Sequence, residues 1–177
     1  YDFNLILAPG VISAVHSSIS AKIITTCEDR GDAFAILDPV VYGKNVGDAT
    51  SAADDRDSNY AAMYWPWVKV PDGLIAGTQR WVPPSVVLGG IYAFNDKVAH
   101  PWFAPAGLNR GGIDVAIQAE RKLTQADRDT LYDSNVNPIA AFPGQGVTVF
   151  GQKTLQKKAS ALDRVNVRRL LIRLKKF

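Results

Sequence analysis

The histidines are the residues on which a metal site or a Ser-His-Asp triad would have to be built, and only His16 and His100 occur. Imidazole is the usual general base near neutral pH and a common metal ligand. His16 falls within a helical pattern, His100 precedes Pro101 in an aromatic loop, and no Gly-x-Ser-x-Gly string is present. We therefore expect two histidines with packing or hydrogen-bonding roles, no catalytic residue and no bound metal.

Nucleotide or carboxylate chemistry would have to use the ends of two apolar segments. Residues 8–11 follow an expected strand and open an expected helix, but they lack the Gly-x-Gly-x-x-Gly that lets a backbone approach pyrophosphate. Asp38 ends the next apolar segment, where enzymes often hold a carboxylate. Without a partner motif, a capping or turn role before Pro39 is favoured, and no cofactor is expected.

The acidic cluster at Asp54, Asp55 and Asp57 has the composition of a cation-binding loop. An EF-hand pattern needs glycine at its sixth position and glutamate at its twelfth, and these positions hold Asn59 and Trp65. We interpret the cluster as solvated acids within a long mobile loop at residues 43–59. The single cysteine, Cys27, cannot form an internal disulfide, and we expect it to be a buried, inert thiol.

Charge is distributed unevenly along the chain. Residues 151–177 contain nine Lys or Arg and one acid, a net charge of +8, whereas the rest holds 11 basic and 16 acidic residues, a net charge of −5. Such polarity suits contacts between copies of the chain, or between its basic end and phosphate or an acidic partner. The basic residues lie opposite an apolar stripe, which favours an ordinary surface helix over nucleic-acid binding. No apolar run approaches the roughly 18 residues of a membrane span, so we expect no membrane insertion.

The 177 residues are within the range of one domain, and their patterns predict an α/β fold. Apolar residues 5–8 and 33–37 predict parallel strands, and the spacing of Val11, Val15, Ile19 and Ile23 predicts the helix of a βαβ unit. Residues 60–65 predict a central strand, and residues 82–94 predict a helix whose apolar face includes Val86 and Phe94. We expect a central, mostly parallel sheet with covering helices.

An α+β part is expected to follow the parallel region. Thr124 and Asp127 form a capping box for a helix that ends near residue 134, and residues 136–142 and 147–150 predict two strands joined by a turn. Asp163 is predicted to cap a final helix. The apolar positions of that helix are Val167, Leu170, Leu171 and Leu174.

Two segments contain many residues of special geometry or charge and no catalytic arrangement. Residues 102–112 contain Pro105, Gly107, Asn109, Arg110 and Gly111, and residues 163–170 contain Asp163, Arg164, Asn166, Arg168 and Arg169. Between them lie Asn137-Pro138-Ile139 and Gly151-Gln152-Lys153-Thr154.

This ordered set resembles the tail sheath proteins of contractile bacteriophages. Their subunits carry a Trp-x-x-Pro-Ala-Gly-x-Asn-Arg-Gly loop, then Asn-Pro-Ile, Gly-x-Lys-Thr and Asp-Arg-(Ile/Val)-Asn-Val-Arg-Arg. The resemblance covers roughly residues 60–174 well and roughly residues 5–39 more loosely.

The resemblance implies a non-enzymatic structural subunit that stacks in helical rows around an inner tail tube and contracts to drive the tube through the host envelope. The implied partners are other copies of the chain, the tube protein, and baseplate and tail terminator proteins. The implied location is the virion tail, assembled in the bacterial cytoplasm. Sheath subunits usually carry N- and C-terminal arms that exchange strands with neighbours, so we expect residues 1–177 to be a core fragment without these arms.

The motif residues have two possible roles. Pro105, Gly107, Gly111 and Gly112 can fix an irregular loop that Asn109 and Arg110 hold against the sheet through carbonyls or carboxylates. Alternatively, arginines at 110, 164, 168 and 169 meet acids on another subunit or on the tube. Two other functions stay open: a sheath subunit of another contractile injection machine, such as a bacteriocin particle or a secretion system, and a small-ligand α/β enzyme using the strand ends near Pro9 and Asp38.

Overall fold

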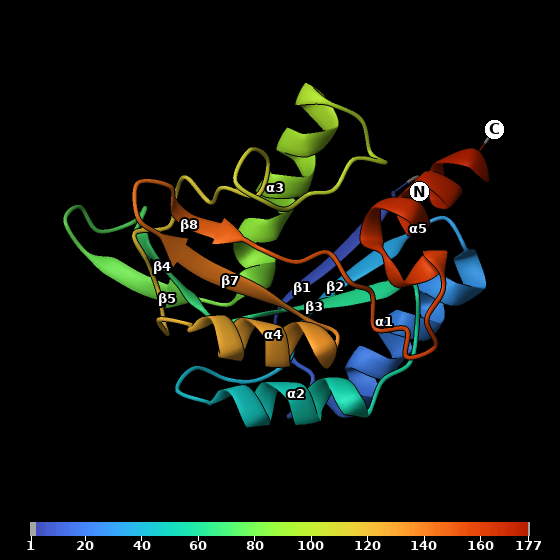
Figure 1. Ribbon diagram of the computed structural model, residues 1–177, viewed down its shortest axis with the longest axis horizontal. Coiled ribbons are helices and arrows are strands. Elements are labelled where there is room, and N and C mark those ends of the chain that lie inside the picture. The colour runs from blue at the N-terminus through green and yellow to red at the C-terminus, as the bar shows by residue number, and fades with distance from the viewer. Residues whose placement is uncertain (1–2, 177) are drawn as a thin grey trace.

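A five-stranded sheet with helices on both faces forms the centre of the computed structural model, which describes residues 3–176 (Figure 1). Its strands follow the order β1-β2-β3-β7-β8, and their bounds are β1 Leu5–Ile12, β2 Phe34–Asp38, β3 Ala61–Trp65, β7 Val136–Phe142 and β8 Gly146–Val149. The first four are parallel, and β8 pairs antiparallel with β7. The predicted α/β class with a mostly parallel sheet is confirmed.

A second, smaller sheet is antiparallel and has the order β5-β4-β6. It consists of β4 (Val68–Pro71), β5 (Gln79–Val82) and the two-residue β6 (Gln118–Ala119). Strand β4 follows closely on β3 in the sequence, and Val82 of β5 precedes the next helix. The small sheet therefore links the central strand to that helix.

Helices cover both faces of the large sheet because successive strand residues point to opposite sides. Phe34 and Ile36 of β2 pack with helix α3 (Pro84–Val98). Ala35 and Leu37 pack on the opposite side, where the core includes residues of α1 (Ser17–Arg30), α2 (Val46–Asp54) and α4 (Gln125–Asp133). Burial on both faces explains why this strand is a continuous apolar run.

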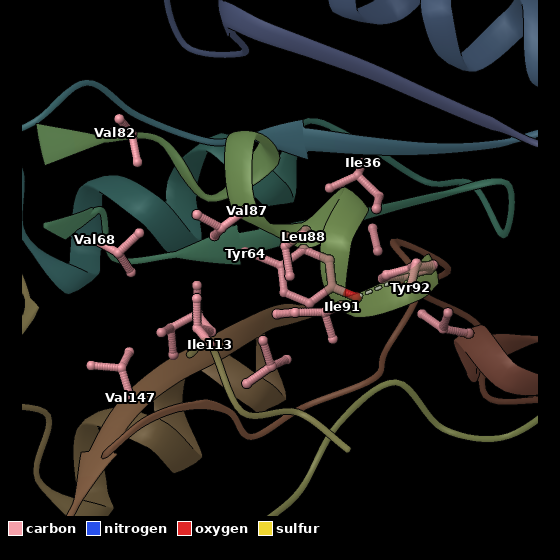
Figure 2. Close-up of a cluster of buried hydrophobic side chains, with 14 of the residues drawn as sticks. Ile36, Tyr64, Val68, Val82, Val87, Leu88, Ile91, Tyr92, Ile113 and Val147 are labelled. Atoms are coloured by element: carbon pink, nitrogen blue, oxygen red, sulfur yellow. Dashed lines mark hydrogen bonds between the residues drawn. The ribbon is translucent and has the colours of Figure 1, made fainter. Parts of the chain in front are cut away.

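Two tyrosines form the polar centre of the cluster beneath α3. The hydroxyl groups of Tyr64 in β3 and Tyr92 in α3 lie 2.6 Å apart and share a hydrogen bond (Figure 2). Burial raises the pKa of Tyr64 and raises that of Tyr92 to about 12, so both phenols remain neutral. The shared hydrogen bond satisfies the two hydroxyls inside an apolar core.

The βαβ start, the central strand and the helix that begins at Pro84 are confirmed, as is the β7–β8 turn. The capping box is also confirmed, because the Asp127 amide donates to Thr124 Oγ1 and the Thr124 amide donates to Asp127 Oδ2.

The predicted apolar face of α3 is partly wrong: Val86 and Phe94 are exposed, and Leu88 and Tyr92 are buried in addition to Val87 and Ile91. Gly89 lets this helix approach β1, since a Cβ there would lie 2.8 Å from Leu7 Cδ1.

The prediction that the first strand stops at Pro9-Gly10 is wrong. Strand β1 continues to Ile12 with a register shift against β2 between Leu7 and Ile12, and Gly10 adopts a φ of +90°. An edge strand tolerates such an irregularity because one side carries no ladder. Helix α1 consequently begins at Ser17. It buries Ser20, Ile24 and Cys27, whereas Val15 and Ile19 are 61% and 48% exposed.

The prediction of a long mobile loop at residues 43–59 is also wrong, because α2 occupies its centre. Asn45 Oδ1 accepts from the Asp48 amide, and Asp48 accepts from the Asn45 amide, which forms a reciprocal cap. The helix buries only Ala49 and Ala53, so its apolar face is too small to stand out in the sequence. Asp57 lies after the helix, where its carboxylate accepts from the Lys157 amide at 3.0 Å.

Candidate functional site

The segment at residues 105–112 lies along the outer edge of β8. The Gly107 amide donates to Val149 O at 2.8 Å, and the Val149 amide donates to Gly111 O at 2.8 Å. The Ile113 amide then donates to Val147 O. The backbone of this segment thus forms hydrogen bonds with the open edge of β8, although it is a turn and not a regular strand.

Two glycines make that close approach possible for different reasons. Gly107 has a φ of +83°, which L-residues with side chains rarely adopt. A Cβ at Gly111 would lie 2.6 Å from Val149 O and 2.8 Å from the Gly107 nitrogen. Gly111 is therefore required by contact with backbone atoms, which have little freedom to move.

The polar residues of the same segment have different environments. Arg110 Nε donates to Ala104 O at 3.3 Å, and its guanidinium lies 5.0 Å from the centre of the Phe103 ring. Asn109 is exposed. The hydrogen-bond partner of Arg110 is therefore a carbonyl of its own segment and not a carboxylate.

The second motif surrounds the start of helix α5 (Val165–Leu174), and Asp163 does not cap this helix as predicted. Asp163 belongs to a short 3-10 turn, η1 (Ala161–Asp163), and its Oδ1 lies 3.4 Å from Arg164 Nε. The N-cap residue is Arg164 itself, whose Nη1 donates to the Tyr132 hydroxyl at 2.8 Å. Residues 160–163 form their own turn, so the helix begins one residue later than a cap at Asp163 requires.

The predicted apolar face of α5 is wrong as well. Its buried residues are Val165, Arg168, Arg169 and Ile172, whereas Leu171 and Leu174 are exposed. Because the arginines occupy the inner side, part of the leucine stripe points outward. Sequence periodicity alone misses this because buried arginine is rare without a specific partner.

Those partners are aromatic and acidic residues of earlier elements. Arg169, 4% exposed, donates to both carboxylate oxygens of Asp96 at 2.8 and 2.6 Å, and its guanidinium lies 4.8 Å from the Tyr92 ring centre. Arg168, 8% exposed, lies 4.2 Å from the Tyr60 ring centre. Burial lowers the pKa of Arg168 from its usual value.

The two intermediate motifs meet at the start of α5. Asn137 Nδ2 donates to Met63 O and Lys153 O, and its Oδ1 accepts from the Lys153 amide at 2.6 Å. Gln152 accepts from the Val165 amide through its backbone and from the Asn166 amide through its side chain. Residues 137–139, 151–154 and 163–170 therefore form one hydrogen-bonded cluster. Strand β8 connects this cluster to residues 105–112.

The residues considered for catalysis are in unreactive environments. His16 Nδ1 accepts from the Ile12 amide, and His100 stacks on Trp102 at 4.5 Å between ring centres. Asp38 is buried and accepts from the Ser85 amide and hydroxyl, which caps α3. Burial also raises the pKa of the Cys27 thiol to about 11. Among residues 3–176, no group of three His, Cys, Asp or Glu side chains is arranged to hold a metal ion.

Arg168 and Arg169 are buried, the carboxylates of Asp38 and Asp96 accept hydrogen bonds, and residues 105–112 cover the edge of β8. These features stabilise the fold and indicate a structural role. A comparison with protein families matches residues 1–155 to the family described as phage tail sheath protein central domain. The chain belongs to this sheath family. The family is structural and non-enzymatic, which removes the small-ligand enzyme as an interpretation of Asp38.

Two curated sheath proteins and one solved sheath structure are similar to the chain. The tail sheath protein of Vibrio phage KVP40 is 46% identical over 97 residues, which cover 55% of this chain and 14% of that protein. The tail sheath protein of Enterobacteria phage T4 is 42% identical over 96 residues, which cover 54% and 15%. The sheath complex of an extracellular contractile injection system, PVC, in the contracted state matches with a TM-score of 0.79 and 26% identity, covering 99% of this chain and 46% of that one.

The matched part of this sheath chain thus spans about one seventh of those two curated relatives. Within the described part of the sheath domain, no helix combines the length and apolar character of a membrane crossing. Asp96 and Tyr92, which bind Arg169, were not among the predicted site residues. Gln152 belongs to one of the motifs, but its bond to the start of α5 was not predicted. The sequence offers no local signal for the ion pair, because Asp96 and Arg169 are 73 positions apart.

Proposed function

We propose that the chain is the central part of a tail sheath subunit that assembles in helical rows around an inner tail tube. Contraction of these rows drives the tube through the host envelope. The observation that carries the proposal is the family match over residues 1–155. The relatives from phages KVP40 and T4 support a phage tail in particular.

The proposed partners are other copies of the chain, the tube protein, and the baseplate and tail terminator proteins at the two ends of the tail. The proposed location is the virion tail, assembled in the cytoplasm of a bacterial host. Between residues 151 and 177 the net charge is +8, which supports electrostatic contacts with acidic surfaces of these partners.

For the motif residues, the brace role has more support than the interface role. Arg168 and Arg169 are buried by side chains of the same chain, and Arg110 binds a carbonyl six residues away. Gly107 and Gly111 hold their segment on β8. We propose that Pro105, Gly107, Asn109, Arg110 and Gly111 shape the covered sheet edge, and that Asp163, Arg164, Asn166, Arg168 and Arg169 fix α5.

A second candidate is a sheath subunit of another contractile injection system. The PVC sheath complex supports it, because its similarity covers 99% of this chain. The two candidates differ in the particle that contains the protein. Mass spectrometry of the purified particles separates the two candidates. A phage particle contains head proteins in addition to tail proteins, and an injection system contains no head proteins.

Expression of the full-length protein and negative-stain electron microscopy test the shared proposal. We expect rings or hollow tubes with helical order. A full-length protein that remains monomeric at every concentration and salt condition tried contradicts the proposal.

A further inference from the structure

The turn between β4 and β5 contains Asp72 followed directly by Gly73, and it lies at one end of the molecule (Figure 1). No other aspartate or asparagine of the sequence precedes a glycine. Glycine has no side chain to shield its amide nitrogen or to restrict its backbone angles. This dipeptide is therefore the place in the chain where a main-chain nitrogen can most easily reach the carboxyl carbon of the preceding aspartate.

The folded turn holds the two groups beside each other. The Leu74 amide donates to Asp72 Oδ1 at 3.0 Å, so the carboxyl group of Asp72 is folded back over the Gly73 peptide. Gly73 is exposed, and a Cβ there would meet no atom within 4 Å. Within residues 3–176 the Gly73 amide has no hydrogen-bond partner. Neither packing nor hydrogen bonding thus prevents the Gly73 nitrogen from approaching Asp72 Cγ.

The hydrogen bonds that close the hairpin do not involve the Gly73 nitrogen. The Asp72 amide donates to Thr78 O at 2.9 Å, and the Thr78 amide donates to Ile75 O at 3.2 Å. Leu74 and Ile75 are 87% and 59% exposed, so residues 73–77 can shift with little loss of packing. A reaction between Asp72 and Gly73 consequently requires no unfolding of the strands.

We propose that Asp72 is a site of spontaneous isoaspartate formation in the folded protein. The isoaspartyl residue that results carries a free carboxylate on its Cα, which is the group that isoaspartyl methyltransferases recognise. The inference does not rest on the proposed function, because only the atoms of the hairpin and water take part.

The reaction needs no reactant other than water. The Gly73 nitrogen uses its electron pair to form a bond to Cγ of the protonated Asp72 carboxyl, and the bond from Cγ to the hydroxyl oxygen breaks. That oxygen leaves as water, with the carboxyl proton and the proton of the Gly73 amide, and a five-membered succinimide remains. Water then adds to one of the two succinimide carbonyl carbons and breaks its bond to nitrogen. Addition at Cγ restores aspartate, and addition at the main-chain carbon gives isoaspartate.

Isoaspartate changes the hairpin locally. The main chain then passes through Cβ and Cγ of residue 72, so the turn gains one carbon atom between the Cα of residue 72 and the Gly73 nitrogen. The bond from the Leu74 amide to Oδ1 is lost, because Cγ becomes a main-chain carbonyl carbon. The pairing of β4 with β5 begins at Pro71 and Gln79 and is expected to persist.

Peptide mapping of aged full-length protein tests the proposal, with a matched site in the same chain. Trypsin cleaves after Lys and Arg, so it releases residues 70–80, which contain Asp72, and residues 111–121, which contain the exposed Asp114 before Val115. The folded protein is aged in water labelled with heavy oxygen. We expect isoaspartate in peptide 70–80 to incorporate one heavy oxygen atom and to accept a methyl group from S-adenosylmethionine in the presence of an isoaspartyl methyltransferase. Its formation should be about tenfold faster than in peptide 111–121, which corresponds to an activation barrier lower by about 1.4 kcal/mol.

The variant G73V tests the nitrogen that reacts. The branched side chain of valine shields its own amide nitrogen, and position 73 has open space around it, so the hairpin is expected to remain folded. Isoaspartate in G73V should form at the slow rate of Asp114. A synthetic peptide of residues 70–80 tests the contribution of the fold, and we expect the folded protein to react at least as fast as this peptide.

Three results overturn the inference. Isoaspartate in the free peptide but not in the folded protein would mean that the turn protects Asp72. Equal rates in G73V and the unmodified protein would exclude the Gly73 nitrogen as the reacting group. Isoaspartate without heavy oxygen would exclude hydrolysis of a succinimide.

Discussion

Arg169 of α5 and Asp96 of α3 form a two-point ion pair, with Nη1–Oδ1 and Nη2–Oδ2 distances of 2.8 and 2.6 Å. The two residues are 73 positions apart in the sequence, and the arginine side chain is almost fully buried. The Tyr92 ring lies beside the guanidinium, and Tyr92 in turn bonds to Tyr64 of β3. A polar chain therefore runs from the last helix through α3 to the central sheet.

Replacement of Arg169 by alanine is expected to lower the free energy of unfolding by about 3 kcal/mol, because Asp96 keeps its charge and loses its partner. R169K should lose less, since lysine keeps the charge but provides neither the two-point geometry nor the stacking. Urea unfolding at pH 7 measures both changes.

Lys22 on the exposed side of α1 offers the matched control, and K22A is expected to change the free energy of unfolding by less than about 0.5 kcal/mol. Equal stabilities of R169A and K22A would show that the ion pair does not hold α5.

The parallel sheet was predictable because its strands are buried on both faces and read as apolar runs. The capping box at Thr124 and Asp127 was predictable for a similar reason, since its hydrogen bonds are local. Residues 43–59 were not, because the helix there buries two alanines and no large apolar side chain. Small residues carry too little hydrophobic contrast for periodicity to detect.

The face of α5 was not predictable because its inner side is set by distant partners. Leu171 and Leu174 have the spacing of a core stripe, yet Arg168 and Arg169 occupy the interior through Tyr60, Tyr92 and Asp96. Spacing reports which residues share a face, and tertiary contacts decide which face is buried. The contacts of the motif residues could be seen only in the fold, because their partners lie on elements far away in the sequence.

The stability of the chain is expected to fall as the pH rises through about 6, because of Asp38. Burial raises the pKa of this carboxyl from 3.8 to about 6, against the two Ser85 hydrogen bonds that lower it. The folded chain thus holds a proton that the unfolded chain has already lost. The resulting stabilisation is full below about pH 3.8 and is lost by about pH 6, a change of about 3 kcal/mol.

Urea unfolding of the unmodified chain and of D38N between pH 4 and 7 isolates this contribution. Asparagine keeps an acceptor for the Ser85 amide and does not titrate, so D38N should lack that part of the pH dependence. The exposed Asp129 provides the control D129N, which should retain it. Identical pH profiles for D38N and the unmodified chain would assign the effect to other groups.

Replacement of Asn137 by aspartate is expected to lower the free energy of unfolding by about 3 kcal/mol at pH 7. The side chains have nearly the same shape, but aspartate loses both donors and places a carboxylate against Met63 O and Lys153 O. Thermal unfolding measures the loss, and the exposed Asn4, which lies outside the motifs, gives the control N4D. If N137D and N4D unfold at the same temperature, the hydrogen bonds of Asn137 do not join the motifs.

Gly111 and Gly112 are adjacent glycines with different requirements, and alanine at each position distinguishes them. At Gly111 a methyl group would lie 2.6 Å from Val149 O and 2.9 Å from the Ala106 Cα, so the segment must move off β8. At Gly112 the nearest atom is the Asp114 carboxylate oxygen at 3.6 Å, an ordinary contact.

We expect G111A to lower the free energy of unfolding by about 2–3 kcal/mol and to expose residues 105–112 to proteolysis, because overpacking against a fixed backbone is relieved only by displacement. G112A should change the free energy of unfolding by less than about 1 kcal/mol. Equal stability and equal protease resistance of the two variants would mean that the segment is free to move and does not brace the sheet edge.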